Sequence, residues 1–280
     1  MNKIVHQETL ANNIKKIEVQ APLVARKALP GQFVVLRVDE NGERIPLTIA
    51  GTDPARGTIT IIFQEVGTTT MKLGLLKEGE SIANLAGPLG KPVEVDHFGQ
   101  VCIVAGGVGA AFLYWMAQAF KARGNRLITI LGARSQNLLV LEKELQSISD
   151  TFILTTDDGS KGEKGLVTTA LARLLQQGEK IDYVLTAGPI PMMKQVAAVT
   201  RPYGIKTVAS LNPIMVDGTG MCGGCRVTVG GKVKFACVDG PDFDAHQVDF
   251  EELARRNSLY HRHEEISRQR FHQCRLQSRT

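Results

Sequence analysis

The stretch QVCIVAGGVGAAFLYWMAQAFKARG, residues 100–124, decides the fold class of this chain. Its apolar segment VCIVA predicts a buried strand. The glycine-rich turn of Gly106, Gly107, Val108 and Gly109 leads from that strand into a predicted helix. Glycines at such a turn let the backbone approach a pyrophosphate, whose charge meets the free N–H groups of the helix N-terminus. The spacing is G-G-x-G and not the full G-x-G-x-x-G, so an ordinary tight turn stays open as the alternative to nucleotide binding.

Three further units of the same kind follow, each a predicted strand that leads into a predicted helix. Four β-α units in a row between residues 98 and 208 predict a doubly wound α/β domain with a parallel sheet. The later units are NRLITILGA with LLVLEKELQSI, TFILTTDD with GLVTTALARLLQQG, and IDYVLTAGP with MMKQVAAVTRPYG.

The ends of the later strands add to the predicted nucleotide site. TAGPIPMMKQ brings Gly188, Pro189 and Met192 to the carboxyl edge of the sheet, where ligands of open parallel sheets bind. Core filling is the alternative for Met192. Asp157 lies in the polar loop TTDDGSKGEKG between these strand ends. No acid follows the second strand, where Arg134 and Ser135 offer groups suited to a 2′-phosphate, so the choice between NAD and NADP stays open.

Residues 1–97 have a different pattern, in which short runs rich in Val, Ile, Thr and Phe are bounded by turn signals such as Asn-Gly, Asp-Pro and Gly. Examples are IKKIEVQAP, GQFVVLRVDENGERIPLTIAGTD and GTITIIFQEVG. Strand-like runs at such regular intervals predict an antiparallel barrel or sandwich. We expect a β-barrel as the first domain.

Two segments of this first domain together suggest an anion site. ERIPLTIAG carries Arg44 and Thr48 on an otherwise apolar strand, and EVGTTTMKLGLL places Gly67 and three threonines at a predicted helix start. An arginine can bind a phosphate with two hydrogen bonds, and the N–H and O–H groups at the start of a helix can donate hydrogen bonds to the same pyrophosphate. A solvated arginine and a simple helix N-cap are the alternatives.

Composition excludes several classes of function. A chain of 280 residues that is 43% hydrophobic suits two or three domains. The net charge of +5 arises mainly in residues 251–280, with seven arginines against four glutamates, so no nucleic-acid surface is indicated. We find no signal peptide and no apolar run that could span a membrane. Five cysteines in no disulfide pattern favour a reducing, cytoplasmic setting.

Three of these cysteines lie in DGTGMCGGCRVTVGGKVKFAC, within a third region of residues 209–250 that is rich in Gly and Cys. Cys222, Cys225 and Cys237 leave one position of a four-ligand metal site unfilled. Cys102 lies inside the apolar strand VCIVA and is expected in the core. Cys274, in the basic tail, is expected to be an exposed and unpaired thiol.

In this order, the motifs R-x-P-[LI]-[ST]-I, G-T at a helix start, GPLG, AGGVG and AGP resemble the ferredoxin–NADP reductase superfamily, over about residues 1–250. More narrowly, the chain is similar to the iron–sulfur flavoprotein subunit of dihydroorotate dehydrogenase type B. The resemblance implies a barrel that binds FAD, a parallel sheet that binds a nicotinamide nucleotide, and a C-terminal segment that binds a 2Fe-2S cluster. Residues 251–280 would form a basic tail.

The resemblance also implies roles for particular residues. It puts the FAD pyrophosphate at Arg44 and at the helix start, the isoalloxazine along the strand, and the nicotinamide end near Gly188 and Pro189. The arginine stands one residue further from the threonine than in many members of the superfamily. The implied flavin residues are Arg44, Pro46, Leu47, Thr48, Ile49, Gly67, Thr68, Thr69 and Thr70, and the implied nucleotide residues are Gly106, Gly107, Val108, Gly109, Arg134, Asp157, Gly188, Pro189 and Met192.

Asp217 is the candidate for the missing cluster ligand. Plant-type 2Fe-2S sites use C-x4-C-x2-C and a distant Cys, and Asp217 stands where the first cysteine would be. A carboxylate is anionic and can bind iron, and being less electron-donating than a thiolate it alters the reduction potential. This ligand set resembles the small subunit of NADH-dependent ferredoxin–NADP oxidoreductases, the electron-bifurcating transhydrogenases. A zinc ribbon and unligated thiols are the alternatives.

The function that this resemblance implies is hydride exchange between NAD(H) and FAD, with single electrons passing through the 2Fe-2S cluster. Thr48 is the candidate for a hydrogen bond to flavin N5. The implied partner is a larger flavin and 4Fe-4S subunit, with ferredoxin reached only indirectly, and the tail is either a solvated extension or a docking segment for that partner. Dihydroorotate dehydrogenase or sulfide dehydrogenase chemistry, and a non-catalytic electron relay, stay open as alternatives.

Overall fold

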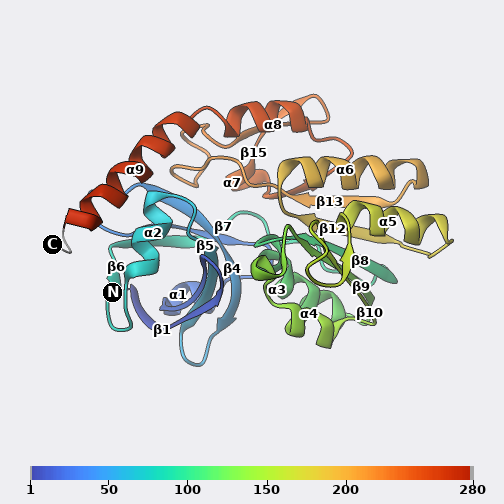
Figure 1. Cartoon of the computed structure of the whole chain (residues 1–280), viewed down its shortest axis with the longest axis horizontal. Helices are drawn as coiled ribbons and strands as arrows, with labels where there is room; N and C mark the ends of the chain where they lie inside the picture. Colours follow the sequence, from blue (N-terminus) through green and yellow to red (C-terminus); the bar gives the residue numbers. More distant parts are fainter. Residues whose placement is uncertain (1, 278–280) are drawn as a thin grey trace.

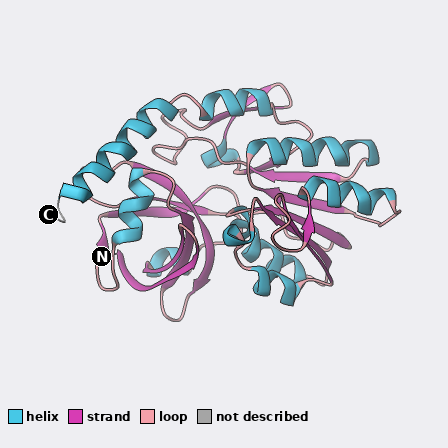
Figure 2. Ribbon diagram, in the orientation of Figure 1, coloured by secondary structure: helices cyan, strands magenta, loops and turns pink. Residues whose placement is uncertain are grey.

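The computed structural model describes residues 2–277 and arranges them as a barrel, an α/β domain and a C-terminal segment that runs over both (Figure 1). The fold class expected from the sequence is confirmed. Figure 2 shows the strands of the barrel curled almost into a ring and those of the α/β domain lying between two layers of helices. Among the described residues, no helix has both the length and the apolar character needed to cross a membrane.

The barrel is one antiparallel sheet of seven strands in the order β6-β1-β2-β5-β4-β3-β7. Because β6 and β7 are neighbours in the sequence but lie at opposite ends of that order, the sheet curls until it is nearly closed. Alternate residues such as Ile17, Ile49 and Ile61 fill its interior and are fully buried. The elements are β1 (Asn2–Ala11), β2 (Ile14–Gln20), α1 (Pro22–Ala25), β3 (Phe33–Arg37), β4 (Arg44–Asp53), β5 (Thr58–Gln64), α2 (Thr68–Leu75), β6 (Ser81–Ile82) and β7 (Asn84–Leu89).

The α/β domain has a sheet in the order β11-β10-β9-β8-β12-β13-β16, parallel from β11 to β13. Helices α3 and α4 cover one face and α5 and α6 the other (Figure 1). The strand order reverses at β8, so the carboxyl ends of β8 and its neighbours flank a crevice suited to a ligand. The elements are β8 (Gln100–Gly106), α3 (Gly109–Ala122), β9 (Arg126–Ala133), α4 (Glu142–Ile148), β10 (Thr151–Thr156), β11 (Glu163–Lys164), α5 (Val167–Gln176), β12 (Tyr183–Ala187), α6 (Ile190–Thr200) and β13 (Lys206–Ser210).

One predicted helix begins later than its sequence pattern suggests. LLVLEKELQSI predicts a helix from Leu138, but that residue ends a short 3-10 turn and α4 begins at Glu142. The backbone turns at Leu141, whose φ is +55°, an unusual value for a leucine. This turn buries Leu139 and Val140 in the core of the domain, so tertiary packing overrides the local helical pattern.

The C-terminal segment connects the two domains. A hairpin of β14 (Arg226–Val229) and β15 (Lys232–Phe235) leads through α7 (Ala236–Asp239) to β16 (Asp242–Asp244), which adds an antiparallel edge to the α/β sheet. Then α8 (Phe250–Asn257) packs beside α6, and α9 (His261–Gln277) crosses to the barrel and lies beside α2 (Figure 1). The tail therefore forms a helix against the barrel.

Candidate functional site

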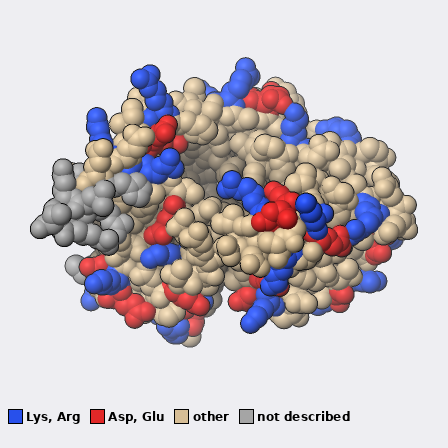
Figure 3. All heavy atoms as spheres, viewed as in Figure 1, with Lys and Arg blue, Asp and Glu red and all other residues tan. Residues whose placement is uncertain are grey.

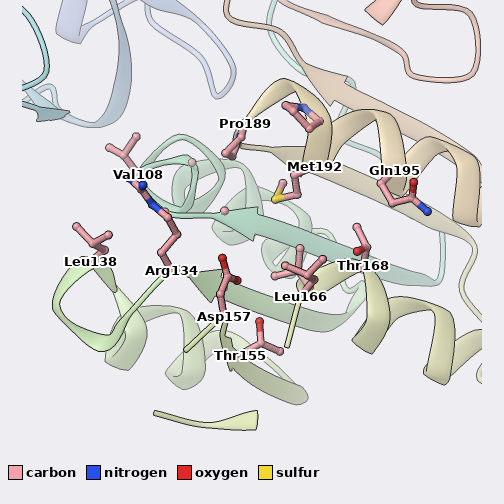
Figure 4. A pocket seen from close by; sticks show the side chains of 18 of the residues that line it. Val108, Arg134, Leu138, Thr155, Asp157, Leu166, Thr168, Pro189, Met192 and Gln195 are labelled. Atoms are coloured by element: carbon pink, nitrogen blue, oxygen red, sulfur yellow. The ribbon is translucent and has the colours of Figure 1, made fainter. Parts of the chain in front are cut away.

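A cleft of about 660 Å³ lies at the carboxyl edge of the parallel sheet, where Ile14 and Gln64 of the barrel form part of its wall. Its polar and apolar walls come mostly from the ends of β8, β9, β10 and β12 and from the start of α6 (Figure 4). All of the residues that we expect to bind the nucleotide line this cleft: Gly106, Gly107, Val108, Gly109, Arg134, Asp157, Gly188, Pro189 and Met192.

The conformation of the turn after β8 explains why this turn is rich in glycine. Gly107 has a φ of +55°, and a Cβ added there would meet no atom within 4 Å, so its backbone faces open space. A Cβ at Gly109 would clash with the carbonyl oxygen of Ala187 in β12, so this glycine lets α3 begin directly against the neighbouring strand. Met192 packs over Gly106 at the wall of the cleft, while Met193 is fully buried as core. The turn thus exposes its backbone to a ligand at Gly107 and packs tightly against β12 at Gly109.

The cleft also contains polar groups without a partner, as a nucleotide site requires. Thr155 is 2% exposed, and its Oγ1 has no hydrogen-bond partner within the described part of the chain. Arg134 and Asp157 point into the cleft from adjacent strand ends (Figure 4). The backbone N–H of Asp157 donates to Ala133 O at 3.1 Å, which fixes the loop that carries the carboxylate. These residues fit a dinucleotide with ribose hydroxyls and a pyrophosphate.

Sequence reasoning missed several residues of this cleft. Thr155 is the last but one residue of β10, and the paired threonines of TFILTT were its available signal. Gln195 comes from the second turn of α6, and Asn212 from the segment after β13, which no nucleotide motif marks. Ser135, considered with Arg134 for a 2′-phosphate, is not among the described residues that line the cleft.

Strand β4 divides its predicted flavin residues between two faces. Leu47 packs against the barrel core and Ile49 is fully buried in it. Because side chains alternate along a strand, Arg44, Pro46 and Thr48 lie on the outer face. The Arg44 side chain is exposed and forms no hydrogen bond or ion pair with the other described side chains or backbone, so its guanidinium is free to meet an anion.

The start of α2 contains a threonine that caps the helix and a neighbouring threonine whose hydroxyl has no partner among the described residues. The Thr70 hydroxyl accepts from the backbone N–H of Gly67 at 3.0 Å and of Val66 at 3.1 Å, so this side chain caps the turn locally. Thr69 is 8% exposed and forms no side-chain hydrogen bond with the described residues. Thr68 Oγ1 lies 2.8 Å from Ser267 Oγ of α9. The first N–H groups of a helix have no internal partner, so this end fits a phosphate.

The four predicted cluster ligands lie in one loop and the turn that follows its hairpin. Asp217 accepts backbone N–H bonds from Thr219 at 2.7 Å and Cys222 at 2.9 Å, which lower the pKa of its carboxyl. Cys225 and Cys237 are buried with their sulfurs 3.2 Å apart, and Cys222 is exposed. Backbone N–H groups point at two of the sulfurs, from Gly224 to Cys222 and from Cys237 to Cys225, each at 3.4 Å.

These donors suit an iron–sulfur cluster by their chemistry. Burial, followed by the neighbouring Cys225 thiol, raises the pKa of Cys237 to about 12. Metal ligands of this type bind as thiolates, which a bound metal ion stabilises. Within residues 2–277, no three acidic, thiol or imidazole groups stand close enough together to bind a metal as they lie. Cys102 is fully buried in β8, as expected, and the side chain of Cys274 lies outside the described residues.

One apolar cluster joins the three predicted cofactor sites. It contains Phe33 and Val35 of β3, the start of α6 with Met193, and the cysteines Cys225 and Cys237. Phe33 and Val35 are the cross-strand partners of Thr48 and Pro46, so the outer face of β4 lies beside this cluster. A Cβ at Gly218, next to Asp217, would lie 2.9 Å from Val35 Cγ2. The loop with the candidate iron ligands therefore packs one strand away from the candidate flavin face.

Comparison with known proteins agrees with this arrangement. Residues 212–249 match the iron–sulfur cluster binding domain of dihydroorotate dehydrogenase B, and residues 103–198 match an oxidoreductase NAD-binding domain. The chain is 48% identical over 271 residues to a dihydroorotate dehydrogenase B (NAD(+)) electron transfer subunit homolog of Thermotoga maritima, covering 97% of this chain and 95% of that protein. The electron transfer subunit of Bacillus cereus is 32% identical over 256 residues, covering 88% of this chain and 96% of that protein.

Solved structures give the same result. A structure of the NADH-dependent reduced ferredoxin-NADP oxidoreductase, which was used to study flavin-based electron bifurcation, is 47% identical with a TM-score of 0.92, covering 97% of this chain and 98% of the matched chain. Phthalate dioxygenase reductase is 16% identical with a TM-score of 0.57 and covers 81% of this chain and 85% of that one, so it shares the fold alone.

Proposed function

Because this chain belongs to the family of dihydroorotate dehydrogenase B electron transfer subunits and their homologues, we propose that it is an NADH-oxidising flavin and iron–sulfur subunit. It exchanges hydride between NAD(H) and FAD and passes single electrons through a 2Fe-2S cluster to or from a partner. The similarity to the NADH-dependent reduced ferredoxin-NADP oxidoreductase favours that reaction over dihydroorotate or sulfide oxidation.

The observation that carries this proposal is the shared apolar cluster. The outer face of β4, the start of α6 and the buried cysteines all adjoin it, so flavin, nicotinamide and iron would meet around one dry core. Excluding water there keeps electrons and hydride from side reactions and strengthens electrostatic interactions. An FAD bound there accepts two electrons as a hydride and can release them singly to a one-electron centre.

On the barrel, we assign the isoalloxazine to the outer face of β4 and the pyrophosphate to Arg44 and the start of α2. Thr48 donates to or accepts from flavin N5, because a hydroxyl can follow a change in protonation there. Gly67, Thr68 and Thr69 supply N–H and O–H donors to the phosphates. No general acid or base of the chain is required, since these residues position and stabilise the cofactor.

In the cleft, we assign the dinucleotide pyrophosphate to the backbone at Gly107 and the nicotinamide end to Gly188 and Pro189. Asp157 accepts hydrogen bonds from ribose hydroxyls, and its negative charge disfavours a 2′-phosphate. The cleft therefore favours NADH over NADPH. At the cluster, Asp217 joins Cys222, Cys225 and Cys237 as the ligands, and the backbone N–H groups at the sulfurs tune the potential.

The electron transfer subunits among the relatives imply a partner subunit for this chain. We propose that the partner is a larger subunit with its own flavin and 4Fe-4S centres, which in turn reacts with ferredoxin. Met221 is 88% exposed beside the exposed Cys222, and Val216, in the same loop, is 49% exposed. Val238, which packs against Gly220 of this loop, is 39% exposed, so the candidate cluster loop has an apolar rim. Free thiols at a metal site favour a reducing, cytoplasmic setting.

The proposal is tested by purifying the protein and mixing it rapidly with NADH and, separately, with NADPH. We expect one FAD and one 2Fe-2S cluster per chain, and faster flavin reduction by NADH. Flavin reduction by neither nucleotide would leave only the electron relay, and a colourless protein with bound zinc would refute the cluster.

A further inference from the structure

The C-terminal helix α9 has few buried side chains among those that the structure describes. Ser267 and Phe271 are partly buried, and the other described side chains of the helix are exposed. Packing of an apolar face supplies most of the stability of helices in proteins, and little of α9 is packed in this way. Contacts outside the core therefore contribute to holding α9 in place.

The start of α9 is fixed by the preceding helix. Arg256 of α8 donates through Nη2 to Gly224 O at 3.1 Å, inside the loop of the candidate cluster ligands. Asn257 donates through Nδ2 to Asn212 O at 3.0 Å, at the rim of the nucleotide cleft. These bonds aim α9 away from the α/β domain and across the barrel (Figure 1).

On the barrel, α9 lies against the start of α2. Ser267 Oγ is 2.8 Å from Thr68 Oγ1, which joins α9 to the turn that we assign to the FAD phosphates. Beside this contact, a cleft of about 320 Å³ is lined by Val66, His261, Glu264, Glu265 and Arg268. The four α9 residues repeat at helical spacing and form one face. Figure 3 shows the surface hollowed on this side of the molecule, between the barrel and the α/β domain.

The polar groups of this cleft match one half of a dinucleotide. Arg268 forms no ion pair within residues 2–277, and its guanidinium can bind a pyrophosphate with two parallel hydrogen bonds. Glu264 and Glu265 are acceptors suited to ribose hydroxyls, and Val66, 60% exposed, offers an apolar contact to a base. Thr69, buried and unpartnered, lies one residue from the Thr68–Ser267 contact.

From these contacts we propose that α9 is the outer wall of the flavin site and binds the adenosine diphosphate half of FAD, with Arg268 and Ser267 on the pyrophosphate. This inference rests on the proposed function, because it takes FAD as the ligand of the barrel. The tail then acts within its own chain, and FAD adds to the contacts that hold α9 against the barrel.

The test compares Arg268→Ala with Arg270→Ala in the full-length protein. Both variants remove one exposed arginine from α9, but Arg270 lies outside the cleft on a different face. We expect FAD to dissociate about tenfold to a hundredfold more readily from Arg268→Ala, measured by flavin fluorescence. Riboflavin, which lacks the phosphates, should bind both variants and the unmodified protein alike, and Arg270→Ala should match the unmodified protein. Ser267→Ala should weaken FAD binding by a smaller factor.

Equal FAD affinities in Arg268→Ala and Arg270→Ala would overturn the inference and leave the proposed function intact. Loss of the copurifying partner with FAD content unchanged would instead identify α9 as a docking segment, which also overturns it. Absence of FAD from the unmodified protein would overturn the proposed function itself.

Discussion

The nucleotide cleft and the cluster loop are built in opposite ways. The cleft lies at the ends of β8, β9, β10 and β12, and its shape depends on backbone conformation, as at Gly107 and Gly109. The cluster loop lies before β14 and contains no helix or strand. Its candidate ligands are side chains, and backbone N–H groups hold the carboxylate of Asp217 in place. The cleft exists before its ligand binds, whereas the loop needs iron to bring its donors together. Substitutions should therefore act on affinity in the cleft and on assembly in the loop.

The largest effect should follow from Cys237→Ser. The substitution removes a buried ligand, so we expect the chain to lose its iron and its cluster absorbance while it retains FAD and its reduction by NADH. Iron analysis and visible spectra of the purified protein measure this. Cys102→Ala is the matched control, because Cys102 is also a buried thiol but belongs to the core of β8. Normal iron content in Cys237→Ser would refute its role as a ligand.

A large effect on affinity should follow from Gly107→Ala. The added Cβ strains a backbone with φ at +55° and occupies the open space in front of it, so NADH should bind about tenfold to a hundredfold more weakly. FAD and iron content should not change. Gly178→Ala is the control, because Gly178 has a φ of +82° with equally open surroundings but does not line the cleft. Similar losses in both variants would mean that the effect is general strain.

An intermediate effect should follow from Thr48→Ala. Loss of the hydroxyl on the outer face of β4 should slow flavin reduction by NADH about tenfold, the size expected for one lost hydrogen bond. Stopped-flow absorbance gives the rate. Thr52→Ala, further along the same strand, should react at the normal rate. An unchanged rate in Thr48→Ala would remove this role from Thr48.

The smallest effect should follow from Asp217→Cys. A fourth thiolate keeps the ligand count and the charge, so we expect full iron content and a lower reduction potential, because a thiolate donates more electron density to iron than a carboxylate does. A spectroscopic redox titration measures the potential. If iron content and potential both stay the same, the fourth ligand lies elsewhere and Asp217 only caps its turn.

The sequence predicted residues whose role depends on the local backbone better than residues whose role depends on tertiary contacts. Glycines at the end of a strand indicate a tight turn by themselves, so Gly106, Gly107 and Gly109 could be identified from the local sequence alone. The paired threonines of TFILTT marked Thr155 only weakly, because its role depends on which strand ends meet. The contact between Thr68 and Ser267 joins residues far apart in the chain, and no local pattern of α9 predicts it. The turn at Leu141 likewise depends on the burial of neighbouring side chains in the core, which the local sequence does not reveal.

The central claim is that the three sites act as one path for electrons around the shared apolar cluster. Its most direct test is to mix the isolated protein with one equivalent of NADH without oxygen and to follow flavin absorbance and the cluster signal in the same samples over time. We predict loss of flavin absorbance and then reduction of the cluster within the same turnover. A reduced flavin beside a cluster that stays oxidised would contradict the claim.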